Sequence, residues 1–274
     1  MIRRVRLIIL CGVFLVLSAV AFGIFLNSIY RLPVLMYHSV DYTSDKKDRI
    51  TIPPEVFAKQ MKFLHDSKYN VVPLDKAVSY IAQKKRPPSK TAAITFDDGY
   101  ENNYKNVFPV VKEYHIPVTI FIITGMIGKD GYLNRKEIKE MSDSGIVDIE
   151  SHTKTHLWIT GLGDKVLEDE LEGSKNTLEN MLGKKVDYLC YPMGGYDERV
   201  KEAVRRAGYK AAFATKPTRL LPVYDLYEIK RVRISPAANN LFVFYIKLTG
   251  YHAFFRVVMN DYLDIHSLFP KGKK

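Results

Sequence analysis

Apolar and polar positions alternate along most of this chain with the periods of strands and helices. Eight short apolar runs have the length and composition of buried strands, and the segments between them repeat apolar side chains as amphipathic helices do. In the first such helix, Phe57, Met61 and Leu64 recur at i, i+4 and i+7. The predicted strands are Val34–Tyr37, Asn70–Val72, Ala92–Phe96, Val118–Ile123, Val147–Ser151, Asp187–Tyr191, Ala211–Thr215 and Glu228–Ile234. The predicted helices are Pro54–Ser67, Asp75–Lys84, Asn102–Tyr114, Arg135–Asp143, Lys165–Leu182 and Glu198–Ala207.

This alternation predicts an α/β fold with a mainly parallel sheet and helical crossovers. Seven or eight such units within about 200 residues favour a (β/α) barrel over an open sheet. We expect the barrel domain to span residues 31–235, followed by an aromatic-rich tail at 236–274. The tail contains an apolar stripe at helical spacing that is predicted to pack on the barrel or on a membrane: Tyr251, Phe254, Phe255, Val258 and Tyr262.

The N-terminus carries a stretch of twenty uncharged residues, Leu7 to Leu26, preceded by Arg3, Arg4 and Arg6. A helix of this length spans the hydrocarbon core of a bilayer, and the arginines favour a cytoplasmic N-terminus. We therefore expect residues 1–30 to form a cytoplasmic stub and one transmembrane anchor, with the remaining chain outside the cytoplasm. The alternative is a cleaved signal peptide, because Ala19-Val20-Ala21 fits a cleavage site, although the apolar run continues beyond it.

The net charge of the chain is +11, and three of the positive charges lie within the first six residues. The remaining excess favours a polyanionic envelope or a membrane surface as a neighbour. No stacking motif or recognition helix suggests a nucleic-acid partner. Cys11 lies in the apolar segment and Cys190 in the body of the chain, so we expect no intramolecular disulfide. The oligomeric state is left open.

Four side chains with metal-binding chemistry follow two of the predicted strands. Asp97 and Asp98 come directly after Ala92–Phe96, and His152 and His156 come after Val147–Ser151. Functional residues of β/α barrels collect at such strand ends. Two imidazoles and one carboxylate suit a borderline divalent metal, which would also offset the repulsion between the adjacent aspartates. Because successive side chains of an extended segment diverge, one aspartate is enough as a ligand and the other is free to accept a proton.

The stretches TFDDG (95–99) and SHTKTH (151–156) together resemble the motifs of polysaccharide deacetylases, the NodB-homology group or carbohydrate esterase family 4. The resemblance covers roughly residues 33–234. It implies a distorted barrel that hydrolyses N-acetyl groups of N-acetylglucosamine-type polymers with a divalent metal, most often zinc, with Co, Ni, Fe or Mn as alternatives. Carried over to this chain, Asp98, His152 and His156 bind the metal, and Asp97 is the general base. The opening PVLMYHSV (33–40) resembles the poly-N-acetylglucosamine de-N-acetylase branch.

One family motif is altered in this chain. Where the family has Arg-x-Pro-aromatic-Gly, this sequence has Cys190-Tyr191-Pro192-Met193-Gly194. The resemblance implies that Tyr191, Pro192 and Met193 lie at the substrate, and that the Met193 backbone N–H stabilises the oxyanion. The arginine that orients the base is missing. Lys230, Arg231 and Arg233 on the last predicted strand are candidates to replace it, and we select Arg231.

The general acid is the residue for which the family pattern is least helpful. The family places it in a late Leu-x-His motif, and the only late match is the loose Leu263-Asp264-Ile265-His266. We instead predict His38, which stands at the end of the first predicted strand. In a closed barrel the first strand neighbours the last, so a late residue of one chain order can appear early in another.

The expected function is therefore metal-dependent removal of N-acetyl groups from an N-acetylglucosamine-containing envelope polysaccharide, with release of acetate outside the cell membrane. One alternative is a membrane-tethered glycan-binding protein with a degenerate site, which the altered third motif favours. The intact Asp97 argues against it, because binding does not need a base. A metal phosphoesterase is a further alternative, but the chain has no second carboxylate cluster for a two-metal site.

Overall fold

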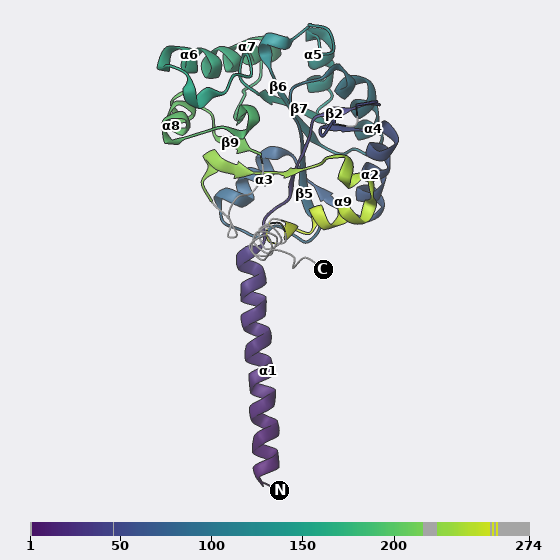
Figure 1. The fold of residues 1–274 in the computed structure, drawn as a ribbon, viewed down its shortest axis with the longest axis vertical. Coiled ribbons are helices and arrows are strands. Elements are labelled where there is room, and N and C mark those ends of the chain that lie inside the picture. Colours follow the sequence, from purple (N-terminus) through teal and green to yellow (C-terminus); the bar gives the residue numbers. More distant parts are fainter. Residues whose placement is uncertain (1, 46, 216–223, 253, 255, 257–274) are drawn as a thin grey trace, which may run out of the picture.

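The computed structural model describes residues 2–45, 47–215, 224–252, 254 and 256. Figure 1 shows a rounded β/α domain from which one long helix, α1, projects. The helices are α1 (Ile2–Ile29), α2 (Pro54–Asp66), α3 (Leu74–Ala82), α4 (Phe108–Glu113), α5 (Arg135–Asp143), α6 (Asp164–Glu168), α7 (Ser174–Leu182), α8 (Glu198–Arg206) and α9 (Leu241–Leu248). Short 3₁₀ or π turns are η1 (Asn103–Val107), η2 (Thr124–Met126), η3 (Ile159–Gly161), η4 (Asp169–Gly173), η5 (Pro192–Gly194), η6 (Leu226–Glu228) and η7 (Pro236–Asn239).

The main sheet runs in the order β10-β9-β8-β7-β6-β5-β1-β11, with every neighbouring pair parallel. The short strand β4 pairs with β5 beside this path, and β2 and β3 form a separate pair. The strands are β1 (Val34–Tyr37), β2 (Ser39–Val40), β3 (Thr51–Ile52), β4 (Asn70–Val71), β5 (Thr91–Phe96), β6 (Val118–Ile122), β7 (Val147–Ser151), β8 (Tyr188–Cys190), β9 (Ala211–Ala214), β10 (Ile229–Lys230) and β11 (Val232–Arg233).

Both edges of the main sheet belong to one short run of chain. β10 pairs with β9 and β11 pairs with β1, and only Arg231 separates the two edge strands. The Arg231 N–H donates to the Thr215 carbonyl at 2.8 Å, and the Ile234 N–H donates to the Met36 carbonyl at 2.9 Å. The sheet therefore nearly closes on itself, which confirms the predicted parallel (β/α) barrel.

The burial of the strands follows from this closure. Every residue of β1, β5, β6 and β9 is buried, as expected for parallel strands covered on both faces. Phe57, Met61 and Leu64 of α2 are also fully buried, so the predicted apolar stripe faces the barrel.

Three predicted elements are interrupted or irregular in the structure. The predicted helix Lys165–Leu182 is divided into α6, the π turn η4 and α7, and the predicted strand Glu228–Ile234 is divided at Arg231. The helix predicted at Asn102–Tyr114 likewise begins with the π turn η1. The remaining predicted elements agree with the observed bounds within two residues, whereas α9 was not predicted.

Two described residues of the predicted apolar stripe pack against the end of α1. The Tyr251 ring lies 5.7 Å from the Tyr30 ring, and the Phe254 ring lies 5.8 Å from the Phe25 ring. Phe255, Val258 and Tyr262 of the predicted stripe lie outside the described residues, as does His266.

The barrel has two ends, and helix α1 joins it at one of them. Its segment Ile9–Ile29, 21 residues, is long and apolar enough to cross a membrane. Because α1 leads directly into β1, it joins the barrel at the amino ends of the strands (Figure 1). Side chains that follow the carboxyl ends of the strands therefore lie at the opposite end of the barrel.

Candidate metal and catalytic site

The two aspartates occupy a tight turn directly after β5. Both are buried, and Asp98 and Gly99 have φ angles of 74° and 73°. Glycine is required at the second position, because a Cβ on Gly99 would lie 2.7 Å from Ile122 Cδ1. The chain reverses so sharply here that the neighbouring carboxylates face different partners.

Asp98 faces the two histidines that follow β7. Its Oδ1 lies 3.4 Å from His152 Nε2 and 3.7 Å from His156 Nε2. The donor atoms of the three residues all lie within 4.8 Å of one another. Ligands that hold one tetrahedral ion with bonds of about 2.0–2.2 Å are separated by roughly 3.3–3.6 Å. The spacing of these three residues therefore suits a common metal ion.

The hydrogen bonds of the histidines also fit a metal. His152 Nδ1 lies 2.8 Å from the Cys190 carbonyl, which can only accept, so Nδ1 carries a proton and Nε2 points toward Asp98. Burial, and then the neighbouring His152, lower the pKa of His156, which favours the neutral form that binds metals. Burial lowers the pKa of His152, but the neighbouring Cys190 and Asp98 outweigh it and raise the pKa well above its usual range. The position beside Asp98 therefore favours a positive charge, which a metal ion would also supply.

The loop between the two histidines is held by Glu170 of η4. This buried carboxylate accepts from the Lys154 N–H at 2.9 Å and the Thr155 N–H at 2.8 Å, and also from the Thr155 hydroxyl. The loop needs this support because Thr153 and His156 have φ angles of 63° and 61°, which are unfavourable for residues other than glycine. Glu170 was not predicted from the sequence, because no motif distinguishes it from the other acids of its helical segment.

Asp97 faces away from the histidine pair and binds Arg231. The guanidinium Nη1 and Nη2 donate to Oδ1 and Oδ2, each at 2.6 Å, and the arginine is fully buried. Nη1 also donates to Thr95 Oγ1 at 2.9 Å. Burial by itself would raise the pKa of Asp97, but the paired guanidinium outweighs it and holds the pKa below its usual range. Asp97 is therefore ionised at neutral pH.

Comparison with known proteins places this arrangement in a family. The family described as polysaccharide deacetylase matches residues 84–212. The Bacillus subtilis protein YxkH, assigned provisionally to the polysaccharide deacetylases, is 36% identical over 209 residues, 76% of this chain and 73% of that protein. This chain belongs to the polysaccharide deacetylase family.

Two further polysaccharide deacetylases are similar to this chain in sequence or in structure. The poly-β-1,6-N-acetyl-D-glucosamine N-deacetylase of Staphylococcus epidermidis is 30% identical over 200 residues, 68% of each chain. The crystal structure of a polysaccharide deacetylase from Bacillus cereus superposes with a TM-score of 0.69 and 32% identity, covering 79% of this chain and 68% of that one. Membership makes the protein a hydrolase of this class with a candidate metal site.

The altered third motif of this deacetylase lies beside Arg231. The Cys190 thiol stands where the resemblance expects an arginine, and its Sγ lies 2.9 Å from Arg231 Nη2. Of the three cations considered from the sequence, only Arg231 contacts Asp97. Lys230 donates to the Tyr196 hydroxyl at 2.5 Å, and Arg233 donates to the Arg49 carbonyl at 3.0 Å.

A second donor set overlaps the first but suits a metal less well. Asp97, His152 and Cys190 also lie within ligand distance of one another. However, both oxygens of Asp97 already bind the Arg231 guanidinium, whose positive charge opposes a metal cation at the same place. Asp98, His152 and His156 are therefore the better candidate set for a metal ion.

His38 follows β1 and reaches the same end of the barrel. Its Nε2 lies 3.9 Å from Asp97 Oδ2, and its buried Nδ1 has no hydrogen-bond partner among the described residues. Burial lowers the pKa of His38 more than the nearby Asp97 and Asp98 raise it, so the imidazole is neutral at pH 7.

The three motif residues predicted at the substrate differ in accessibility. Tyr191 is fully buried, with its hydroxyl donating to the Tyr227 carbonyl at 2.9 Å, and Pro192 is also buried. Met193 is 55% exposed and has a φ of 53°. The Tyr191 side chain is thus packed inside the protein beneath the loop. Of these three residues, only Met193 exposes its side chain at the surface.

Proposed function

We propose that this protein is a metal-dependent deacetylase that removes N-acetyl groups from an N-acetylglucosamine-containing polysaccharide of the cell envelope. One observation carries the proposal: a set of three convergent metal donors lies beside a buried carboxylate, Asp97, that Arg231 keeps ionised. A protein that only bound glycans would gain nothing from a buried base held in this way. The arrangement therefore favours an enzyme over the glycan-binding alternative.

Each residue has a role that its surroundings support. Asp98, His152 and His156 would hold the divalent ion, for which zinc is our first choice and Co, Ni, Fe or Mn are alternatives. Such an ion polarises a carbonyl and makes water a better nucleophile. Asp97 accepts the proton of the attacking water. The Met193 backbone N–H would donate to the developing oxyanion.

His38 is the proposed general acid for the leaving sugar amine. Its Nε2 lies 3.9 Å from Asp97 Oδ2. A proton taken up by the carboxylate could therefore pass to the imidazole after a small approach of the two groups or through one water. By this route His38 would gain its proton during the reaction, so it can act as an acid although it is neutral in the resting protein. Asp97 and His38 would then share one proton during the reaction.

An exposed apolar surface beside the site supports a carbohydrate substrate. Trp158, two residues after His156, is 51% exposed, and its ring lies so close to Gly195 that a Cβ there would approach it to 2.8 Å. Trp158 and Met193 thus offer flat apolar area at one rim, which suits the face of a sugar ring. The name of the Staphylococcus epidermidis relative supports a polymer of N-acetylglucosamine.

The proposed location is the cell membrane, with α1 as a single-pass anchor and the barrel outside the cytoplasm. The length and composition of Ile9–Ile29 support this location. The active end of the barrel then faces away from the bilayer, toward the envelope.

Acetate release by the purified full-length chain tests the proposal. We would compare β-1,6-linked N-acetylglucosamine oligomers, chitin oligomers and peptidoglycan fragments, before and after chelation and after metal is restored. We expect metal-dependent release from at least one of them, and loss of both metal and activity in His152→Ala and His156→Ala. A His152 or His156 variant with stoichiometric metal and full turnover would contradict the metal assignment. Release of no acetate from any polymer by the metal-loaded protein would favour the glycan-binding alternative.

A further inference from the structure

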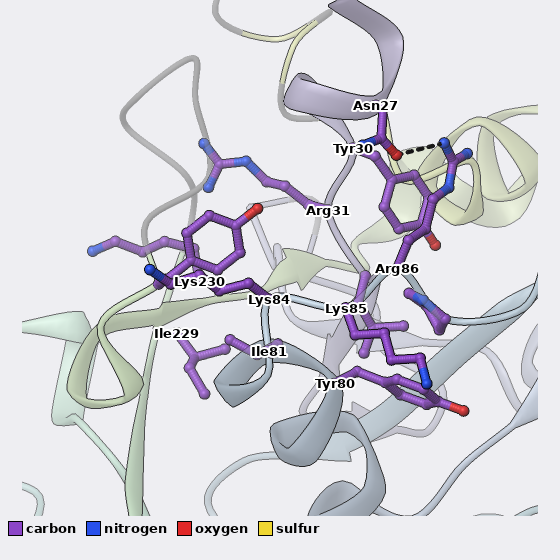
Figure 2. A pocket seen from close by; sticks show the side chains of 13 residues that line it. Asn27, Tyr30, Arg31, Tyr80, Ile81, Lys84, Lys85, Arg86, Ile229 and Lys230 are labelled. Atoms are coloured by element: carbon purple, nitrogen blue, oxygen red, sulfur yellow. Dashed lines mark hydrogen bonds between the residues drawn. The ribbon is translucent and has the colours of Figure 1, made fainter. Parts of the chain in front are cut away.

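A cavity lies at the other end of the barrel, where α1 meets the domain (Figure 2). Its volume is about 110 Å³. Three segments form its walls: the end of α1 with the residues that follow it, the end of α3 with the next loop, and the chain around β10. None of the metal or catalytic candidates lines it, so it is separate from the deacetylase site.

The lining of this cavity has one sign of charge. It includes five basic side chains and three tyrosines, and no acidic residue. The basic residues are Arg31, Lys84, Lys85, Arg86 and Lys230, and the tyrosines are Tyr30, Tyr80 and Tyr224. Figure 2 shows the labelled cations arriving from all three wall segments. A lining of this composition is positive in charge, which favours an anion over a cation in the cavity.

The walls are fixed by contacts that join α1 to the domain. Arg86 donates to Asn27 Oδ1 at 3.3 Å and to the Tyr251 hydroxyl at 3.1 Å, and its guanidinium lies 4.4 Å from the centre of the Tyr30 ring. The Arg31 N–H donates to the Gly250 carbonyl at 2.9 Å. The cavity is thus formed before any ligand arrives, while Lys84 and Lys85 remain exposed at its rim.

The position of the cavity at the end of α1 indicates which class of ligand is available to it. Asn27 belongs to the segment Ile9–Ile29, and Tyr30 and Arg31 follow it directly. When this segment crosses a bilayer, these residues lie at the level of the lipid head groups, where tyrosine and basic side chains are favoured. One wall of the cavity is then in contact with lipid, and the ligand class available there is the head group.

We propose that this cavity binds the phosphate head group of an anionic phospholipid and so holds the barrel in one orientation on the membrane. The proposal rests on the single-pass anchoring proposed above. The active end of the barrel would then be directed away from the bilayer. Envelope polymers with phosphodiester groups share the phosphate chemistry, but the wall formed by α1 favours the lipid.

Native mass spectrometry of the full-length chain, released from nanodiscs, tests the proposal. The nanodiscs contain equal amounts of phosphatidylglycerol and phosphatidylcholine. We expect one phosphatidylglycerol to be retained in preference to phosphatidylcholine. Lys84→Gln/Lys85→Gln should weaken this retention by about 30-fold, since each lysine at a membrane surface contributes roughly a fivefold factor. Lys84→Arg/Lys85→Arg should keep it.

The matched control is Arg135→Gln/Lys136→Gln, which removes the same charge from exposed positions at the start of α5. It should retain lipid as the natural chain does. Equal retention of both lipids, or unchanged retention in Lys84→Gln/Lys85→Gln, would overturn the proposal, and so would preferential binding of soluble glycerol phosphate polymer over phosphatidylglycerol. Acetate release is measured on the same samples, so failure of lipid binding and failure of the deacetylase function are seen separately.

Discussion

Asp97 and Asp98 are adjacent in the chain, yet their surroundings assign them different chemistry. Asp98 Oδ1 faces two imidazole nitrogens, whereas both oxygens of Asp97 bind one guanidinium. A carboxylate whose oxygen lies beside two imidazole nitrogens suits metal coordination. A carboxylate that is ionised and buried next to that set suits proton transfer. The difference arises from the left-handed turn at Asp98.

Substitution of each aspartate by asparagine separates these roles. Asp97→Asn should bind metal within a few-fold of the natural chain and lose roughly 10²–10⁴ in turnover, the usual contribution of a positioned base. Asp98→Asn should lose metal and turnover together. Metal content by mass spectrometry and acetate release distinguish the two variants, and loss of metal in Asp97→Asn would mean that the roles are exchanged.

Arg231 determines the protonation of Asp97 and should determine the acid limb of the pH profile. Arg231 is the largest of the charges that oppose burial at Asp97, so its removal should raise the pKa of Asp97. Arg231→Met should therefore lose kcat/KM at a higher pH as the medium is acidified. Arg231→Lys keeps a positive charge and should shift the limb less. The pH dependence of kcat/KM checks this order. An unchanged acid limb in a folded Arg231→Met would show that Asp97 is not the titrating base.

His38 should affect proton delivery without affecting metal binding. Its Nε2 lies near Asp97 and not within the set formed by Asp98 and the two histidines. His38→Ala should therefore retain metal and slow turnover by about 10²-fold or more. Substrates with a better leaving group than an amine should be affected less. Full turnover in this variant would reject His38 as the acid.

At the scale of elements, the π turn η4 interrupts a helix and places Glu170 against the histidine loop. The chain from 164 to 182 would otherwise be one continuous helix, and the extra residue of a π turn changes the direction of the side chains around it. Glu170 thereby reaches Lys154 and Thr155, which precede His156. The position of His156, a candidate metal ligand, thus depends on an irregular turn in a helical segment that contributes no candidate ligand itself.

Loss of the Glu170 charge should loosen this loop. Glu170→Gln retains one acceptor oxygen but cannot accept from both backbone N–H groups and the hydroxyl, so we expect metal affinity to fall by roughly 10–100-fold. Glu172→Gln changes an exposed acid of the same turn and should leave metal affinity unaltered. Competition with a chelator measures both constants. Equal affinities in the two variants would remove Glu170 from the site.

At the scale of the whole molecule, the barrel separates the candidate metal site from helix α1. The catalytic candidates follow the carboxyl ends of β1, β5, β7 and β8, and α1 enters at the amino ends (Figure 1). The cavity at the α1 end is basic, and the metal candidates lie at the other end. An anchored chain would therefore hold its active end toward the envelope polymer and away from the lipid surface.

The anchor itself can be tested by the mass of the mature chain. We expect the natural protein to stay in the membrane fraction after an alkaline carbonate wash and to retain α1. Ala21→Leu removes the candidate cleavage site and should give a chain of matching length. A natural chain that begins at Phe22, beside an uncleaved Ala21→Leu chain, would establish the signal-peptide alternative.

The sequence by itself determined the order of the elements and indicated the residues of the candidate metal site. Hydrophobic periodicity is a local property, so strands such as Val34–Tyr37 and Val147–Ser151 could be predicted to the residue. Aspartates and histidines directly after strands indicated the metal set, because the carboxyl ends of parallel strands meet at one edge. The family resemblance then supplied the distinction between Asp97 and Asp98.

Only the tertiary structure decided which distant residues support that site. Arg231 lies 134 positions from Asp97, and Lys230 and Arg233 were further candidates from the sequence. Barrel closure directs Arg231 inward to Asp97, whereas Lys230 and Arg233 bind other partners. Glu170 and the basic cavity likewise depend on contacts between segments whose local patterns say nothing about each other. Short-range periodicity specifies each element and its buried face, whereas the partner that a side chain meets across the barrel is set by how the elements close around one core.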